Sequence, residues 1–199
     1  MNLGKLAVRG VVGPLFVGHG TQKLFGWFGG HGLEGTAGFF ESGIGLRPGK
    51  RHATAAGWSE AIGGALLTLG AFTPLAQAMI TGTMVTAIRK VHAQNGPWVT
   101  GNGYEYNLTL IALTAALTET GPGSPSVDAG LFGDSLKGKG WSLAALAAGV
   151  AGSYVVTERL VEPAPGPAPQ EGHADVPGDP ALAQQPRFER ETETAEQNA

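Results

Sequence analysis

The sequence predicts an all-α membrane protein, a polytopic helical bundle, and three observations lead to that prediction. Five apolar stretches divide residues 1–161, and most approach the roughly 20 residues that cross a bilayer. Small residues are frequent in them, and Ala145, Gly149 and Ser153 form a ridge that would let two membrane helices approach closely. No stretch shows a charged stripe with helical period. This argues against the alternative, a soluble alanine-rich bundle.

The five stretches divide into a core and an addition. The first four form a helical core within residues 1–134, and a fifth helix follows within residues 135–161. Proline suits the first turn of a helix, so the second and third helices are expected to form a tight antiparallel hairpin around Thr73 and Pro74. The apolar segments of the five helices are residues 3–28, 54–72, 74–91, 104–120 and 141–161.

The C-terminal segment has a different composition. Residues 162–199 hold seven of the 13 prolines and eight of the 16 acidic residues, with almost no large apolar side chain. Such a segment cannot bury enough apolar surface to offset its ordering entropy, so a disordered acidic tail is expected there. The rest of the chain carries 11 basic and eight acidic residues, a net charge of +3. The chain has no cysteine, which excludes disulfides and thiol catalysis within it.

Ionisable residues of the helical body gather at one level. If the helices alternate in direction, the end of the first, the start of the second, the end of the third and the start of the fourth lie on one membrane side. Charges inside a membrane face the bundle interior and pair, so Lys23 or Arg89 is expected to pair with Glu60. Glu105 would extend this network. The residues at this level are His19, Gln22, Lys23, Trp58, Ser59, Glu60, Arg89, Lys90, His92, Tyr104, Glu105, Tyr106 and Asn107.

Helical spacing predicts that the first of these groups faces inward. His19, Gln22 and Lys23 stand three and four residues apart and therefore share one helix face. A second pair with a spacing of three lies at the end of the third helix. Both groups are expected to point toward Glu60, which lies inside the second helix. The spacing therefore predicts a polar site within the bundle.

Each of these residues also has a simpler role. Lys90 can extend to the lipid headgroups, and the tryptophans and tyrosines can form an interfacial belt. His31 and His52 are expected in a solvated loop, and His19 alone could be an ordinary core histidine. Taken singly, only Glu60 and His19 favour function. Gathered at one level, the residues predict a functional pocket.

Several segments together resemble the DoxX family of bacterial membrane proteins. The resemblance covers roughly residues 1–134 and includes the start of the fourth helix, with its glutamate and tyrosines. The second helix contributes a glutamate followed by two glycines, Glu60, Gly63 and Gly64. The other matching segments are HGTQKLFG (19–26), GTAGFF (35–40), LGAFTPLA (69–76) and GPGSPSVDAGLFG (121–133).

This resemblance implies a four-helix membrane core with a redox-linked role in the bacterial plasma membrane. The family is named for a subunit of a thiosulfate:quinone oxidoreductase. Relatives are linked to membrane oxidoreductase complexes that handle oxidative stress together with a superoxide dismutase and a sulfurtransferase. The fifth helix and the acidic tail go beyond the usual four-helix pattern.

The residues themselves favour a quinone site. A quinone needs a flat apolar slot, donors for two carbonyl oxygens and a source of two protons. Histidine can donate a hydrogen bond and changes charge near neutral pH, and a buried carboxylate paired with a cation can relay protons. Glu60 and His19 are therefore the candidate catalytic residues. The candidate substrate-binding residues are Gln22, Lys23, Trp58, Arg89, His92, Glu105 and Asn107.

No cofactor of the chain's own is expected, because the sequence has no haem-attachment motif, dinucleotide fingerprint or metal-ligand cluster. The expected bound molecule is a quinone, and electrons would come from a substrate or from a soluble redox partner. No nucleic-acid partner is expected. Whether the chain is itself an enzyme stays open at this point.

Two other functions fit the same sequence. The chain could be a non-catalytic anchor or assembly subunit, whose small-residue faces and acidic tail bind soluble partners or a second copy. It could also be a small transporter, for which an acidic residue at midplane and glycine-rich helices are typical. A change such as Glu60→Gln separates the first alternative from a quinone site, because it would abolish activity only in the latter.

Overall fold

The computed structural model describes residues 2–164, in which the regular secondary structure is entirely helical, with no strand. The predicted all-α fold is confirmed. The disordered tail predicted for residues 162–199 lies outside the described residues, apart from its first three. The α-helices of the described part are α1 (Leu3–Phe25), α2 (Gly32–Gly38), α3 (Gly49–Leu69), α4 (Thr73–Ala87), α5 (Glu105–Thr120), α6 (Val127–Leu131) and α7 (Lys139–Tyr154).

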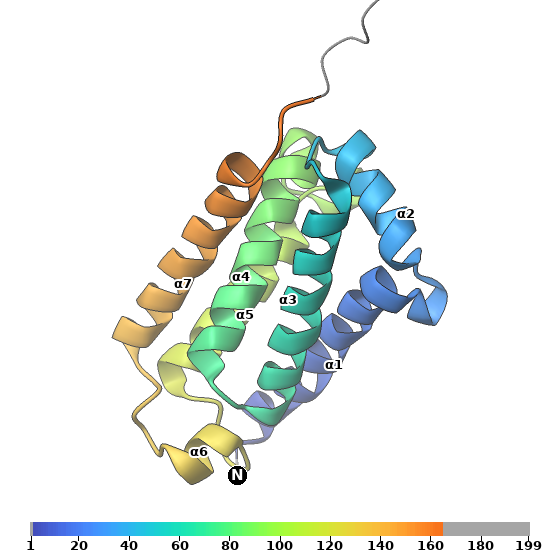
Figure 1. The fold of residues 1–199 in the computed structure, drawn as a ribbon. Helices are drawn as coiled ribbons and strands as arrows, with labels where there is room; N and C mark the ends of the chain where they lie inside the picture. Colours follow the sequence, from blue (N-terminus) through green and yellow to red (C-terminus); the bar gives the residue numbers. More distant parts are fainter. Residues whose placement is uncertain (1, 165–199) are drawn as a thin grey trace, which may run out of the picture. The chain divides into compact units, whose positions relative to one another are not determined.

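Five long helices form a bundle, in which α1 packs on α3, α3 on α4, and α4 on both α5 and α7 (Figure 1). The helices α3 and α7 make little contact with each other although both pack on α4. The short α2 packs against α3 near the end of α1, and α6 lies at the opposite end of the bundle. The five long helices correspond to the five predicted ones, whereas α2 and α6 were not predicted.

Glycines bring α1 and α3 into direct backbone contact. A Cβ atom at Gly20 would lie 2.5 Å from both the Gly57 oxygen and the Ala61 nitrogen. Two turns away, a Cβ atom at Gly64 would lie 2.6 Å from the Gly13 oxygen. Any larger side chain at these positions would force the helices apart. The frequent glycines therefore serve close helix packing, as expected for membrane helices.

The predicted small-residue ridge of α7 lies against α4. Ala145, Gly149 and Ser153 are all buried. A Cβ atom at Gly149 would lie 2.6 Å from the Thr81 Cβ atom, and the Ser153 hydroxyl is 2.9 Å from the Thr86 hydroxyl. The fifth helix is thus a packed member of the bundle.

The α3–α4 hairpin is held by two buried charges that cap its helix ends. Arg9 of α1 is 4 % exposed and donates to the Leu67 and Thr68 carbonyls in the last turn of α3, at 3.3 and 3.0 Å. Because the C-terminal end of a helix carries partial negative charge, a cation there is stabilising. Arg9 also donates to the Pro122 and Pro125 carbonyls and so ties the loop after α5 to α3.

The start of α4 has the opposite charge beside it. Asp128 of α6 is 1 % exposed and accepts from the Phe72 and Thr73 backbone N–H groups at 2.6 and 2.8 Å. It also accepts from the Thr73 hydroxyl at 2.6 Å. Asp128 therefore satisfies N–H groups that the first turn of a helix leaves unpaired. The hairpin is confirmed, and its two ends are capped by residues distant in sequence.

Among the described residues, one helix is long and apolar enough to cross a bilayer by length and composition alone, residues Lys139–Arg159. It is the continuation of α7 into the turn that follows. The helices α1 and α3 have 23 and 21 residues, but they also contain charged residues and many glycines, which lower their mean hydropathy. Composition alone therefore supports one span rather than five.

Candidate functional site

A cavity of about 500 Å³ lies between α3, α4 and α7. Residues of α4 line it between α3 and α7, and these two helices make little contact with each other. Residues from the turn that follows α2 and from the segment before α3 also line it. The apolar part of the wall includes Phe39, Phe40, Leu46, Met79, Val91 and Val156.

An ion pair lies in the wall of this cavity. Lys23 Nζ of α1 donates to Glu60 Oε2 of α3 at 2.6 Å, and the two side chains are 26 % and 7 % exposed. A buried charge without a partner is strongly unfavourable, and this contact supplies the partner for Glu60. The predicted pairing of Lys23 with Glu60 is confirmed. It places one positive and one negative group inside an apolar cavity.

His52 is the ionisable residue of the cavity lining that the sequence interpretation placed elsewhere. It is 2 % exposed, so the expected solvated loop is wrong. The reason is that α3 begins at Gly49, five residues before the predicted start, and Leu46 and Phe40 pack over its first turns. A usable signal was present, because His52 and Glu60 are eight residues apart and fall on neighbouring parts of one helix face.

The two ring nitrogens of His52 are not equivalent. Nε2 lies 3.2 Å from the Arg47 carbonyl oxygen. Nδ1 has no hydrogen-bond partner among the described residues, although it is buried. Buried polar atoms in native structures are nearly always paired, and Gln77 Oε1 and Thr81 Oγ1 are the other buried side-chain atoms without a partner in the described part of the chain.

Three π-helical turns border the cavity: η2 (Phe39–Gly43), η3 (Ile88–His92) and η6 (Val155–Arg159). Each contributes at least one lining residue, namely Phe39 and Phe40, Val91 and His92, and Val156. Isolated π-turns are rare and occur frequently at functional sites. Their coincidence around one cavity makes this cavity the candidate functional site.

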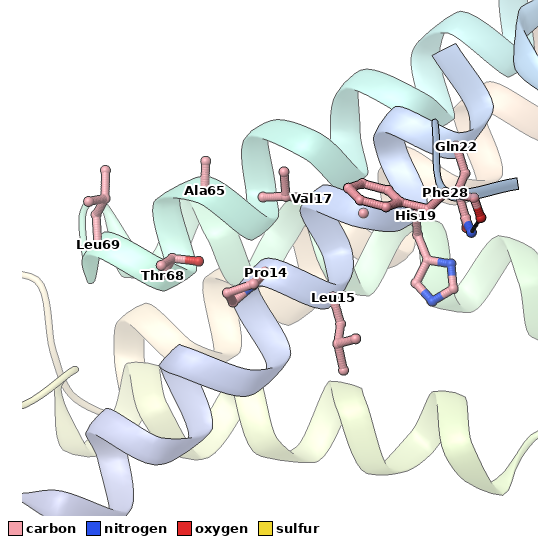
Figure 2. A pocket seen from close by; sticks show the side chains of 10 residues that line it. Pro14, Leu15, Val17, His19, Gln22, Phe28, Ala65, Thr68 and Leu69 are labelled. Atoms are coloured by element: carbon pink, nitrogen blue, oxygen red, sulfur yellow. Dashed lines mark hydrogen bonds between the residues drawn. The ribbon is translucent and has the colours of Figure 1, made fainter. Parts of the chain in front are cut away.

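A separate groove of about 610 Å³ lies on the outer side of α1 and α3 (Figure 2). His19 lines this groove and is exposed, and Gln22, which also lines it, donates to the Phe28 carbonyl at 3.3 Å. The rest of the lining is almost entirely apolar. The prediction that His19 and Gln22 face Glu60 is therefore wrong. Of these three α1 residues, only Lys23 contacts Glu60, whereas His19 and Gln22 line the outer groove.

Comparison with known proteins identifies the family of the part that carries these polar groups. Residues 4–93 match the DoxX family model. Residues 4–93 are a DoxX family domain. DoxX family proteins are membrane proteins, which agrees with the all-helical bundle. No curated protein and no solved structure matches the chain.

The ionisable residues that line the cavity all belong to the DoxX domain. Lys23, His52, Glu60 and His92 all lie within residues 4–93. The opposite wall comes from α7, which lies outside the matched residues. The DoxX domain thus supplies the chemical groups, and the added helix encloses them.

Of the predicted residues at the end of α4, one lies in the cavity and one does not. His92 lines it, and its Nδ1 is 2.7 Å from the Asn102 carbonyl oxygen. Arg89 instead points to the end of α7, where it donates to Glu158 at 2.7 Å. Its guanidinium also lies 3.6 Å from the centre of the Tyr154 ring. The alternative pairing of Arg89 with Glu60 is wrong, because η3 faces α7 at this level.

Three further predicted residues lie outside the cavity. Glu105 accepts from the Val99 backbone N–H at 2.6 Å, so it holds the turn before α5 rather than a charged network. Asn107 is buried and donates to the Met84 sulfur at 3.3 Å. Trp58 is 47 % exposed, and its ring packs edge-on against Phe25, with centroids 6.1 Å apart. These contacts are sufficient to explain the three side chains as structural.

The cavity therefore combines an apolar interior with a small number of convergent polar groups. This combination is typical of sites for small molecules. Within residues 2–164, no group of three or more histidine, aspartate or glutamate residues comes together as a metal-ligand set. Lys23, His52, Glu60 and His92 could form hydrogen bonds with an apolar ligand of the size of a ring.

Proposed function

We propose that this protein is an integral protein of the bacterial plasma membrane that binds a quinone-type molecule between α3, α4 and α7, as part of a redox-linked membrane complex. One observation carries the proposal. A cavity of about 500 Å³ with a largely apolar lining is bordered by the Lys23–Glu60 ion pair and by His52. Glu60 keeps its proposed catalytic role, while His52 takes the place first given to His19.

The size and lining of the cavity suit a substituted ring. Ligand cavities usually span about 300–1,000 Å³ and combine apolar walls with few polar groups. Phe39 and Phe40 supply aromatic surface in the lining. The gap between α3 and α7 offers a lateral entrance for a molecule that is dissolved in the bilayer. A water-soluble substrate would have no reason to enter from that side.

The chain's own residues would bind the ring and hold protons beside its oxygens. Lys23 is a hydrogen-bond donor, and Glu60 is a carboxylate that can accept a proton once a ligand disturbs the ion pair. Electrons would come from a substrate or from a soluble redox partner. The chain is therefore proposed as one subunit of an oxidoreductase rather than as a complete enzyme.

Mass spectrometry of lipid extracts tests this proposal. The protein is purified in mild detergent from a quinone-containing bacterium, as wild type and as two variants of α3. Ala55→Phe would fill the cavity, and Ala65→Phe would fill the groove that contains His19. Both alanines are exposed residues of the same helix, so the two changes are matched.

The expected result is a quinone retained by the wild type and by Ala65→Phe and lost from Ala55→Phe. Loss from Ala65→Phe alone would move the site to the outer groove and restore His19 as the candidate. No quinone in any sample, together with co-purifying soluble proteins or a homo-oligomer, would instead favour the assembly role.

A further inference from the structure

The hydroxyl groups of the cavity lining differ in whether the protein itself uses their hydrogens. These hydroxyl side chains are Ser59 of α3, Thr83 and Thr86 of α4, and Ser153 of α7. Building on the proposed function, we infer that Ser59 is a binding residue of this site, which donates its hydroxyl hydrogen to a carbonyl oxygen of the quinone. The inference rests on the hydrogen bonds of the four side chains and on the position of Ser59.

The hydroxyls of α4 and α7 are already bonded within the protein. Thr83 donates to the Ile80 carbonyl at 3.0 Å. Thr86 donates to the Gly82 carbonyl at 2.9 Å. The Ser153 hydroxyl lies 2.9 Å from that of Thr86, and since the hydrogen of Thr86 is given to Gly82, Ser153 is the donor of this contact. A ligand would have to break one of these bonds to receive a hydrogen from any of them.

Ser59 also differs from the other hydroxyl residues of its own helix. Thr54 and Thr68 of α3 each donate to the backbone carbonyl four residues earlier, at 2.8 Å. A hydroxyl inside a helix can be satisfied in this way without any further partner. The Ser59 hydroxyl makes neither this bond nor any other within residues 2–164. Its hydrogen is therefore available to a ligand.

The position of Ser59 makes this hydroxyl accessible. Ser59 is half-buried and lines the cavity, unlike His52, which is 2 % exposed. Ala55, one turn earlier on the same face of α3, is exposed and lines the cavity as well. The next residue, Glu60, is buried. Ser59 therefore lies at the boundary between the exposed side of α3 and the interior of the cavity.

A free hydroxyl in these surroundings requires an acceptor. The lining of the cavity is largely apolar, and the gap beside it would contain lipid chains rather than water in a bilayer. A hydroxyl left without a partner there is unfavourable. A carbonyl oxygen accepts hydrogen bonds and has no hydrogen of its own. The two oxygens of a quinone are of this kind, so either of them matches the group that Ser59 offers.

Lys23 is another donor of the lining, and its hydrogen bonds are less free. Its ammonium group donates to Glu60 at 2.6 Å. A ligand that draws this group toward itself weakens the ion pair, which is unfavourable for a buried carboxylate. The ring nitrogens of His52 and His92 each lie beside a backbone carbonyl oxygen, at 3.2 and 2.7 Å. Donation by Ser59 breaks no hydrogen bond of the described residues.

A cycle that removes the hydroxyl and the carbonyl oxygens in turn tests the inference. Decylbenzoquinone and decyl-para-xylene have a similar ring and the same chain, but methyl groups replace the two oxygens in the second compound. Their affinities for the full-length protein in lipid nanodiscs are measured by competition against a fluorescent quinone analogue. The wild type and Ser59→Ala are compared.

Ser59→Ala is expected to lower the affinity for decylbenzoquinone about fivefold to tenfold, the effect of one lost hydrogen bond. The affinity for decyl-para-xylene should change less than about twofold, since this compound accepts no hydrogen bond. The two changes together isolate the contact between the hydroxyl and the carbonyl oxygen from any general effect of the variant on the cavity.

Thr83→Val is the matched control. It removes a hydroxyl from the same cavity and keeps the size of the side chain, but that hydroxyl is already donated to the Ile80 carbonyl. Both affinities are therefore expected to stay within about twofold of the wild type. Thermal unfolding of each variant verifies that it is folded.

The outcomes separate the inference from the proposed function. An equal effect of Ser59→Ala on the two compounds, or no effect on either, would overturn the role of Ser59 and leave the quinone site standing. A selective loss of decylbenzoquinone binding in Thr83→Val as large as that in Ser59→Ala would also overturn it. No saturable binding of decylbenzoquinone to the wild type would overturn the proposed function and the inference together.

Discussion

The two ends of the bundle both contain buried charges, but they use them differently. At the end near α6, Arg9 and Asp128 are bonded almost entirely to backbone groups at the ends of α3 and α4. At the end near α2, Lys23 and Glu60 are bonded to each other and border a cavity, beside a histidine nitrogen with no partner in the described part of the chain.

We therefore assign the cluster near α6 a structural role and, following the proposed function, the cluster near α2 a role in ligand binding; the two are called the structural and the functional end below. A buried charge whose hydrogen bonds are made almost entirely to backbone groups contributes to the fold and is not free for a ligand. An ion pair that lines a cavity can still be reached by a ligand. Burial alone would not have distinguished the two clusters, since Arg9 and Glu60 are 4 % and 6 % exposed.

The largest effect on the free energy of unfolding is expected at the structural end. Asp128→Ala removes three hydrogen bonds at the start of α4 and leaves the Phe72 and Thr73 N–H groups buried and unpaired. Unfolding in a denaturant titration should show a loss of about 3–5 kcal/mol, because charged hydrogen bonds in a buried site are each worth about 1.5–3 kcal/mol.

The control for this change is Asp134→Ala. Asp134 also pairs with a cation, Lys137, but it is 81 % exposed, so its removal should leave stability nearly unchanged. Quinone retained per folded molecule should not change in either variant. A selective loss of retained quinone in Asp128→Ala would remove the distinction between the two ends.

The second largest effect is expected from Glu60→Gln at the functional end. The amide still accepts from Lys23 but no longer compensates its charge, so the loss should be about 1–2 kcal/mol, smaller than for Asp128 because Lys23 is 26 % exposed to solvent. Retention of the quinone, measured in the same samples, should be lost.

An exposed ion pair with the same N–O distance supplies the control for Glu60→Gln. Lys50 and Glu34 are also 2.6 Å apart, with side chains 63 % and 79 % exposed. Glu34→Gln should alter neither stability nor quinone retention, since exposed ion pairs contribute little. Equal behaviour of the two variants would show that burial in the cavity has no functional consequence.

His52→Gln should change the free energy of unfolding less than Asp128→Ala or Glu60→Gln does. The variant keeps a donor for the Arg47 carbonyl and removes a nitrogen that has no partner within residues 2–164, so the expected change is within about 1 kcal/mol of zero. Loss of several kcal/mol in the same unfolding measurement would mean that Nδ1 is engaged in the folded protein and is not reserved for a ligand.

The Lys23–Glu60 pair could be predicted from sequence because it depends on a general rule. Charged residues within apolar helices must find partners, and the alternating directions of consecutive helices place few candidates at the same depth. The five long helices were likewise predictable, since each is a continuous apolar stretch. Predictions succeeded where the relevant information lies within one helix or between helices adjacent in sequence.

The structural cluster and His52 depend on contacts that no local pattern contains. Arg9 bonds to carbonyl groups 58 to 116 positions away, and Asp128 to groups 55 and 56 positions away. His52 is buried because the glycine-rich α2 and its π-turn fold back over α3, and α2 has no apolar period to predict it. His19, which belongs to the HGTQKLFG segment, lines the outer groove and not the cavity that contains Glu60.

The smallest effect is expected where α7 joins the DoxX domain. Tyr154→Leu removes the ring beneath Arg89, a contact with its guanidinium 3.6 Å from the ring centre, on a residue that is 50 % exposed. Such contacts contribute about 0.5–1 kcal/mol at exposed sites, so global stability should fall by no more than that. Hydrogen exchange should nevertheless become faster in the turn Val155–Arg159, which borders the cavity. Faster exchange with unchanged quinone retention would show that α7 covers the ligand but does not contribute to its binding. A parallel loss of retention would assign the added helix a direct part in binding and so extend the functional end beyond the DoxX domain.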